Sequence, residues 1–144
     1  VTGIDLIKEQ IRIAAGKKLS YRQQDVRIGG HAIECRINAE NPKEQFRPSP
    51  GLITDVYFPG GKGVRIDTAV YNGYEVPAYY DSMLAKLIVH AKTRKEAISK
   101  MRSALGEVII EGVDTNVDYQ YEIMNHPDYQ AGNVDIEFIS EKMC

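Results

Sequence analysis

The order of patterns along the chain predicts an α+β fold, in which an antiparallel β-sheet has flanking helices. A helical pattern occupies residues 4–15, strand patterns follow between residues 31 and 91, and helical patterns return after residue 93. The strands are grouped together, and an asparagine–glycine pair between two of them is a hairpin signal. A length of 144 residues is sufficient for one hydrophobic core. We therefore expect one domain over residues 1–144.

Composition excludes several classes of protein. Hydrophobic residues make up 43% of the chain and charged residues 26%, which is typical of globular proteins. The formal charge is -2 and no basic tract is long enough to bind nucleic acid. No apolar run approaches the roughly 20 residues that span a bilayer, and no signal-peptide pattern is present. Cys35 and Cys144 form no CxxC pair, and the histidines lack metal-ligand spacing. We expect no membrane or metal site, and a reducing, cytoplasmic location.

The first predicted helix spans residues 4–15. Thr2 and Asp5 form the expected N-terminal cap, and Gly16 is the expected stop. Apolar residues recur between them at helical spacing, namely Ile4, Ile7, Ile11 and Ala14 or Ala15. Residues 17–25 are polar and predict a loop. Since the chain begins with Val1 and enters this helix almost at once, we expect a fragment of a longer protein.

Residues 31–40 alternate as expected for a half-buried strand. One face is mostly apolar and consists of His31, Ile33, Cys35, Ile37 and Ala39. The other face is mostly polar and consists of Ala32, Glu34, Arg36, Asn38 and Glu40. Neighbours on one face are about 7 Å apart, so a carboxylate beside Arg36 can hold its guanidinium. Two interpretations stay open: a solvated face with paired charges, or a site where a fixed guanidinium meets an anion.

Further strands are predicted over residues 52–58, 64–71, 74–76 and 83–91. The run 41–51 contains three prolines and predicts a stiff loop. Asn72 and Gly73 predict a hairpin between the second and third of these strands. The last strand is almost entirely apolar and is expected at the centre of the sheet.

The glycines around Lys62 superficially resemble a phosphate-binding loop. A phosphate loop requires Ser or Thr after the lysine and then a helix, whereas Gly63 and a strand follow here. We interpret residues 59–63 as a hairpin loop. His31 and Cys35 lie about 13 Å apart along their strand, so they cannot form a nucleophile–base pair, and we expect both in the core.

The C-terminal part predicts helices at 93–106, 115–125 and 134–142, with a short strand at 107–111. Thr93 and Glu96 form a capping box for the first of these helices, and Pro127 ends the second. The first helix has an apolar stripe made of Ala97, Ile98, Met101, Ala104, Leu105 and Val108.

The segment Tyr79–Met83 precedes the predicted central strand. Its acidic residue, Asp81, follows two tyrosines, and loops at strand ends often carry function. The alternative is a polar loop that closes over the core. Asp81 can also pair with Arg36 if their two strands are adjacent.

Several stretches together resemble the C-terminal domain of biotin carboxylase, the ATP-dependent component of acetyl-CoA carboxylase and related biotin enzymes. They occur in the family's order and cover essentially the whole chain: Val1–Leu6 with the helix after it, Gly30–Glu40, Pro48–Gly51, Tyr79–Met83 and Thr115–Asn116. The resemblance implies a ligase that uses ATP and bicarbonate to carboxylate biotin on its carrier protein, the first half-reaction of acetyl-CoA carboxylase in fatty acid synthesis.

The resemblance also implies roles for individual residues. Arg36 takes the place of a catalytic arginine that stabilises charge on the biotin ureido oxygen, and Asp81 falls where the family lines the biotin pocket. Ile136 matches an apolar position that packs by the adenine of ATP. Lys62 and Arg65 fall in a region of dimer contacts, although Lys62 replaces an apolar residue.

The family's phosphate- and magnesium-binding residues belong to an ATP-grasp region that precedes the first helix. The resemblance therefore implies ATP, magnesium and biotin in the full-length enzyme, with none of them bound by a motif in this fragment, which we expect to be inactive alone. Implied partners are the biotin carboxyl carrier protein, a second copy of the enzyme and a carboxyltransferase. Two alternatives remain, a non-catalytic protein-interaction module and the same domain of a pyruvate or propionyl-CoA carboxylase.

Overall fold

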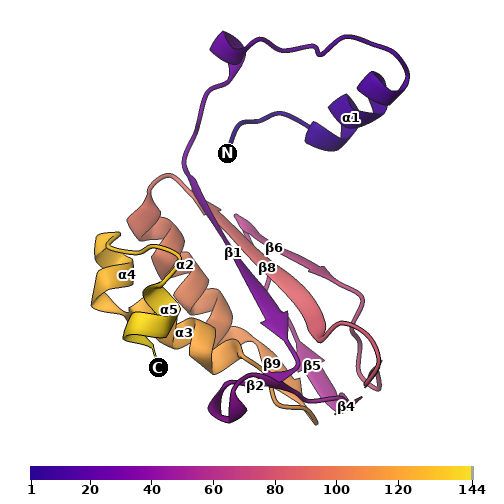
Figure 1. The fold of residues 1–144 in the computed structure, drawn as a ribbon, viewed down its shortest axis with the longest axis vertical. Helices are drawn as coiled ribbons and strands as arrows, with labels where there is room; N and C mark the ends of the chain where they lie inside the picture. The colour runs from indigo at the N-terminus through magenta and orange to yellow at the C-terminus, as the bar shows by residue number, and fades with distance from the viewer. Residues whose placement is uncertain (144) are drawn as a thin grey trace.

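A three-stranded antiparallel sheet is the centre of the structure, a computed structural model that describes residues 1–143 (Figure 1). Strand β8 (Met83–Ala91) lies between β1 (His31–Asn38) and β6 (Val64–Thr68), which confirms the predicted central strand. Cys144, considered above for disulfide and zinc motifs, lies outside the described residues. The predicted α+β class is thus confirmed, with all three central strands antiparallel.

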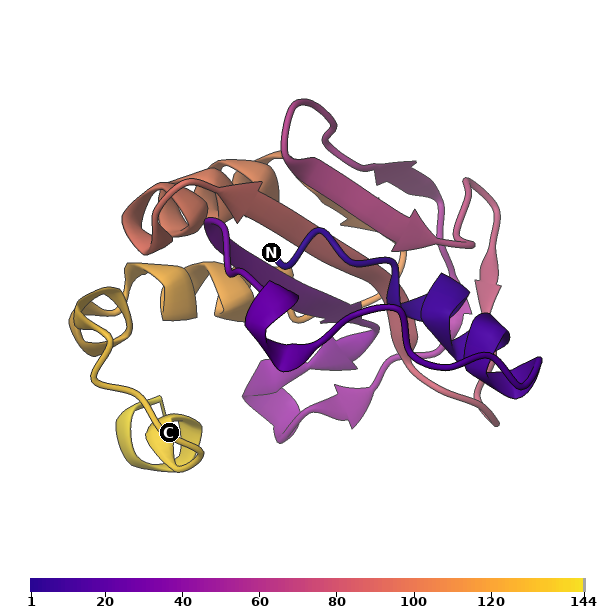
Figure 2. The same cartoon turned by 90° about the horizontal axis from the view of Figure 1, so that it is seen from above.

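Helices cover one face of this sheet, as Figure 2 shows from above. Helix α2 (Arg94–Glu107) begins at Thr93, whose hydroxyl accepts a hydrogen bond from Glu96 N at 3.2 Å, as its capping pattern predicts. The helices after it are α3 (Val117–Asn125), α4 (Pro127–Ala131) and α5 (Phe138–Lys142). The predicted helix 134–142 is therefore too long, and α4 was missed. Pro127 ends α3 but also begins α4, since its missing N–H is no loss in a first helical turn.

Six short strands form three separate two-stranded ladders at the lower end of the sheet. These are β2 (Glu40–Asn41) with β3 (Arg47–Pro48), β4 (Gly51–Leu52) with β7 (Glu75–Val76), and β5 (Asp55–Tyr57) with β9 (Ile109–Glu111). The predicted strand 31–40 is thus divided after β1, and the predicted strand 52–58 is divided into β4 and β5. The predicted loop 41–51 contains the 3-10 helix η2 (Pro42–Glu44).

The hairpin predicted at Asn72 and Gly73 is wrong in its pairing. The turn itself forms, with Gly73 at φ 87° and Tyr74 N donating to Tyr71 O. However, β7 pairs with β4, and β6 pairs with β8. The turn contacts β5 instead, because the side-chain oxygen of Asn72 accepts from Val56 N at 2.8 Å. Residues 59–63 likewise join strands that do not pair with each other.

The main core lies between the sheet and α2. It contains the inward face of β1, the centre of β8 and the predicted stripe of α2, and its fully buried members include Ile37, Leu87, Val89, Met101 and Leu105. A smaller cluster below it contains Ala39, Ile53, Val76 and Leu84. The predicted alternation of β1 is confirmed, because the other face of this strand stays open.

Cys35 is a free thiol in the core, whereas His31 is only half-buried, so the core prediction holds for the cysteine alone. Burial, and to a smaller extent the charge of Glu34, raises the pKa of the Cys35 thiol from 9.0 to about 12. The thiolate form is therefore disfavoured in the folded chain, which excludes a nucleophilic role near neutral pH.

We expect this thiol to make the chain less stable at alkaline pH. An unfolded chain loses the Cys35 proton above pH 9, whereas the folded chain keeps it until about pH 12. The stabilisation is thus complete below pH 9 and is lost as the pH rises toward 12, by up to about 1.4 kcal/mol per pH unit. Urea unfolding at pH 8 and pH 10.5 measures this loss. In a Cys35→Ala variant the loss should be smaller, and an equal loss would contradict the assignment.

The N-terminal arm, residues 1–30, extends from β1 away from the rest of the domain (Figure 1). Its helix α1 (Leu6–Ala14) is capped by Asp5, which accepts from Lys8 N at 2.9 Å, so the predicted helix 4–15 is slightly too long. The predicted loop 17–25 contains a 3-10 helix, η1 (Gln23–Asp25). The predicted apolar stripe exists but is not covered, since Ile11 is 66% exposed.

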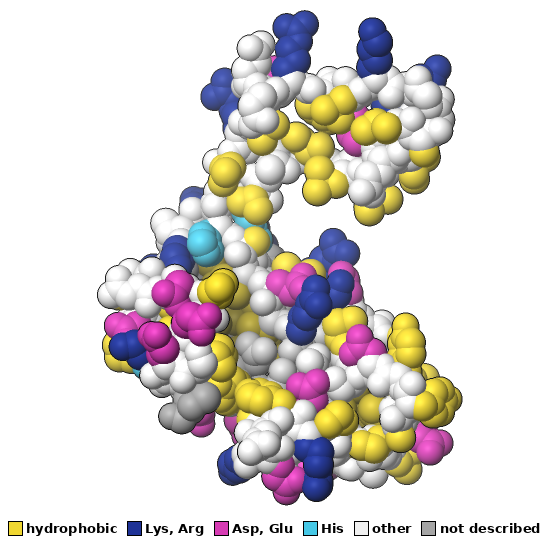
Figure 3. Space-filling model, in the orientation of Figure 1, with side chains coloured by type: hydrophobic (Ala, Val, Ile, Leu, Met, Phe, Trp, Pro, Cys, Tyr) yellow, Lys and Arg dark blue, Asp and Glu magenta, His cyan; other side chains and the backbone are white. Residues whose placement is uncertain are grey.

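The arm joins the domain at Gly30, which has φ 74°. Gly30 packs against the carbonyl of Ala91 and the ring of His90, where a side chain would collide. The His90 ring also contacts the carbonyl oxygen of Gly29 at 3.0 Å. Figure 3 shows a hollow between arm and domain, with hydrophobic side chains along the arm.

Residues 1–143 contain neither a membrane span nor a metal cluster. None of their helices combines the length and the apolar character that a bilayer crossing demands. Nor do their His, Cys, Asp and Glu side chains form a group of three or more that could hold a metal ion.

Candidate functional site

The open face of the sheet carries a patch of charged side chains, which we call the charged face: Glu34, Arg36, Arg65, Asp67 and Lys86. The strand register brings them together, because Arg36 lies opposite Lys86, and Lys86 lies opposite Asp67 on its other side. Figure 3 shows charged side chains of both signs below the hollow. Side chains along each strand point alternately to the two faces of the sheet. The residues next to these charged ones therefore point inward and pack in the core.

Arg36 is held on this face by Glu34. Arg36 Nε donates to Glu34 Oε1 at 3.3 Å, while 66% of the arginine side chain remains exposed. This confirms that a neighbouring carboxylate holds the guanidinium. At this exposure the ion pair contributes less than about 1 kcal/mol, so it orients the side chain more than it stabilises the fold. The two terminal nitrogens have no partner among residues 1–143, and they can donate to an anionic or carbonyl oxygen.

A second ion pair lies across the sheet from Arg36. Arg65 donates from two nitrogens to the two carboxylate oxygens of Asp67, each at 2.8 Å. These hydrogen bonds lower the pKa of Asp67 by more than desolvation raises it, and the charges of Arg65 and Lys86 add smaller lowering contributions. Asp67 is therefore ionised near neutral pH, and Lys86 lies between it and Arg36 across the charged face.

Asp81 does not pair with Arg36, although β1 and β8 are adjacent as that hypothesis required. Asp81 Oδ1 accepts from Met83 N at 2.9 Å, and Arg36 pairs with Glu34 instead. Because Asn38 lies opposite Met83, Asp81 falls beyond the end of β1, about 13 Å along the strand direction from Arg36.

The loop before β8 is also open. Tyr79 is 92% exposed and Tyr80 is nearly as exposed, so the side chains of this loop face away from the core. Asp81 and the tyrosines are thus available to another part of the protein or to a ligand. Loops at strand ends commonly serve in this way.

Ile136 lies between α4 and α5, in the helical part of the structure. Its side chain is 95% exposed, and the described structure brings it to neither Arg36 nor Asp81. An isoleucine this exposed offers apolar surface to a partner surface or a planar ring. The three predicted site residues are thus all accessible, but they form no single site in this chain.

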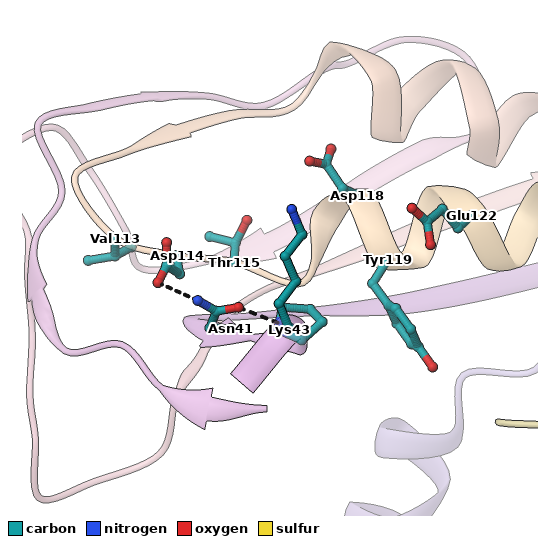
Figure 4. Close-up of a pocket in the computed structure, with 9 residues that line it drawn as sticks. Asn41, Lys43, Val113, Asp114, Thr115, Asp118, Tyr119 and Glu122 are labelled. Atoms are coloured by element: carbon teal, nitrogen blue, oxygen red, sulfur yellow. Dashed lines mark hydrogen bonds between the residues drawn. The ribbon is translucent and has the colours of Figure 1, made fainter. Parts of the chain in front are cut away.

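The pocket in Figure 4 lies between η2 and the start of α3. Its volume is about 510 Å³ and its lining includes Lys43, Asp114, Asp118 and Glu122. Asn41 Nδ2 donates to Asp114 Oδ2 at 3.0 Å along one side. None of the predicted site residues lines this pocket, so it is separate from the charged face.

An α+β domain whose open sheet face displays an exposed guanidinium beside a carboxylate has the geometry to bind an anionic or polar ligand there. Comparison with known proteins specifies the family. Residues 34–141 match the family described as biotin carboxylase C-terminal domain. The chain belongs to this family.

Relatives of several kinds resemble the chain. It is 54% identical to the biotin carboxylase of Allochromatium vinosum over 99% of this chain and 31% of that protein. It is 51% identical to a pyruvate carboxylase component of Methanothermobacter thermautotrophicus, over 98% of this chain and 29% of that protein. The chain thus spans about a third of the length of these relatives.

Solved structures of biotin carboxylase domains also resemble the chain. The biotin carboxylase domain dimer of Hydrogenobacter thermophilus 2-oxoglutarate carboxylase, in complex with MgADP, ADP and bicarbonate, is 48% identical. The TM-score is 0.93, and the match covers 98% of this chain and 31% of that one. The α+β architecture of the chain is therefore that of a biotin carboxylase C-terminal domain.

Proposed function

We propose that this chain is the C-terminal part of a biotin carboxylase and that Arg36 is its catalytic residue. The observation that supports this proposal is the placement of Arg36, which is exposed on an open sheet and oriented by Glu34. In the full-length enzyme, ATP and bicarbonate would be used to carboxylate biotin on a carrier protein.

The chemistry of the substrate explains why an arginine suits this position. Carboxylation requires removal of a proton from a ureido nitrogen of biotin, which places negative charge on the ureido oxygen. The guanidinium of Arg36 stays charged at working pH and can donate to that oxygen from its terminal nitrogens. It stabilises the charged state more than the neutral ground state, and this difference lowers the barrier. Asp81 would contribute to the same biotin pocket from the loop before β8.

We further propose that an ATP-grasp region completes the site and packs on the N-terminal arm. The arm exposes several large apolar side chains that packing against another domain would cover, namely Leu6, Ile7, Ile11, Ile13, Leu19 and Ile28. The chain also spans only about 31% of relatives such as the biotin carboxylase of Allochromatium vinosum. In this proposal residues 1–144 are one domain that supplies one wall of the active site.

The cofactors are assigned to the full-length enzyme. Ile136 offers an exposed apolar surface on which an adenine could pack. Residues 1–143 contain no cluster of three or more His, Cys, Asp or Glu side chains that could hold magnesium. The phosphate and magnesium sites would therefore lie in the ATP-grasp region. When bound, MgATP would supply the activated phosphoryl group for bicarbonate.

The proposed partners are the biotin carboxyl carrier protein, a carboxyltransferase and a second copy of the enzyme. A dimer is favoured by the dimeric Hydrogenobacter structure and by the exposure of Arg65 on β6, an edge strand of the sheet. We propose acetyl-CoA carboxylase as the parent complex, in the cytoplasm. A pyruvate carboxylase is the second candidate, because the Methanothermobacter relative is nearly as similar to this chain.

Carboxylation of free biotin by the full-length protein tests the proposal. With MgATP and labelled bicarbonate we expect labelled carboxybiotin, whereas the 144-residue chain alone should form none, since it lacks the proposed phosphate sites. Reactions without ATP serve as the control. A full-length protein that binds a carrier protein but never carboxylates biotin would favour the non-catalytic interaction module.

A further inference from the structure

Asn116 joins the loop after β9 to the outer edge of β1. Its side-chain Nδ2 donates to Arg36 O at 3.1 Å, and its Oδ1 accepts from Asn38 N at 2.9 Å. Its backbone N donates to Asn38 O at 3.2 Å. Asn116 is only 5% exposed, one of two buried polar or charged residues identified among residues 1–143. A buried amide with both ends paired to one strand is a specific contact.

This contact lies at the end of β1, where the pairing of the sheet alone does not hold the backbone firmly. Strand β1 is at the edge of the sheet, so only β8 pairs with it. The register with β8 also shifts between Ile37 and Asn38, which interrupts regular pairing one residue beyond Arg36. The amide of Asn116 replaces the missing neighbouring strand, because it supplies one donor and one acceptor, as a peptide group does.

The same end of β1 is linked to the loop that carries Asp81. Asn38 Nδ2 donates to Glu40 Oε1 at 3.2 Å, and the hydroxyl of Ser82 donates to that same oxygen. Ala39 N donates to Ser82 O at 2.8 Å. Asn116 therefore fixes one end of a hydrogen-bond chain that sets the Arg36 backbone relative to the Asp81 loop.

We propose that Asn116 is a positioning residue for Arg36. It fixes the backbone from which the guanidinium projects, and Glu34 then orients the side chain. This inference rests on the proposed function, because it assigns Asn116 a role in the biotin half of the reaction only. ATP and bicarbonate bind elsewhere in that proposal, so their use should not depend on Asn116.

The test uses Asn116→Ala in the full-length enzyme. We expect the turnover number for biotin carboxylation to fall about tenfold or more, because small misplacements of a catalytic group are costly. The KM for ATP should stay unchanged, and so should the rate of ATP hydrolysis measured with bicarbonate but without biotin. Asn41→Ala is the matched control, since it also removes two side-chain hydrogen bonds of an asparagine, away from Arg36. Asn116→Asp, which keeps the acceptor for Asn38 N, serves if the alanine variant does not fold, and it should show the same kinetic pattern.

A double variant separates this inference from the proposed function. In an Arg36→Met background, adding Asn116→Ala should cause no further loss of biotin carboxylation, because the group that Asn116 positions is gone. If Arg36→Met impairs the enzyme but the two losses multiply, or if Asn116→Ala lowers biotin-independent ATP hydrolysis equally, the positioning role is overturned while the proposed function stands. A fully active Arg36→Met enzyme overturns both.

Discussion

Replacing Arg36 with methionine in the full-length enzyme is expected to lower the turnover number for biotin carboxylation by about 100-fold or more. Methionine keeps much of the length of the side chain but provides neither charge nor donors. The charge that develops on the ureido oxygen would then lose its fixed cation. Steady-state kinetics with free biotin and MgATP measure this loss.

Several comparisons make the Arg36 result specific. Arg36→Lys keeps the charge but lacks the planar fork, so we expect it to recover only part of the activity. Arg47→Met is the matched control, because Arg47 is also an exposed arginine paired with a carboxylate, Glu44 at 2.9 Å, on a different strand. It should carboxylate biotin at the normal rate. Near-normal carboxylation by Arg36→Met, with unchanged thermal stability, would instead make Arg36 a solvated surface charge.

The contact between Glu34 and Arg36 could be predicted from the sequence. The alternation of residues 31–40 depends on local geometry alone, so it placed Arg36 and Glu34 on one open face correctly. The stripe of α2 and the apolar run of β8 were predictable for the same reason. In each case the residues that define the pattern are near neighbours in the chain.

The errors concern contacts between distant parts of the chain. The turn at Asn72 was recognisable, but its side chain bonds Val56, and the strands on either side pair with β8 and β4, which are distant in the sequence. The stripe of α1 predicted a helix correctly, although the sequence cannot show that this chain leaves it uncovered. Strands β1 and β8 are adjacent as the pairing hypothesis required, but Asp81 lies in the loop before β8, and the register places it beyond the end of β1. The family resemblance identified Thr115 and Asn116 as matching residues, without indicating the contact to β1.

Gly112 is the position where we expect the largest loss of stability from adding a single methyl group. Its φ of 100° is unfavourable for any residue with a Cβ. An added Cβ would overlap the carbonyl oxygen of Leu52 and approach Thr54 N at 3.1 Å. Both obstacles are backbone atoms, so neither can rotate away. We expect Gly112→Ala to lower the free energy of unfolding by about 3 kcal/mol, as the sum of strain and overpacking.

Gly132→Ala separates these two causes. Gly132 has a similar φ of 87°, but an added Cβ there has nothing within 4 Å. It should therefore cost only the conformational strain, about 1 kcal/mol. Urea unfolding of the two variants and the unchanged chain measures the difference, and equal losses would contradict the overlap at Leu52.

The overlap at Gly112 also bears on the site, because the segment from Gly112 leads directly to Asn116. If Gly112→Ala still folds, the displaced backbone should loosen the contact between Asn116 and β1, and biotin carboxylation should fall as it does in Asn116→Ala.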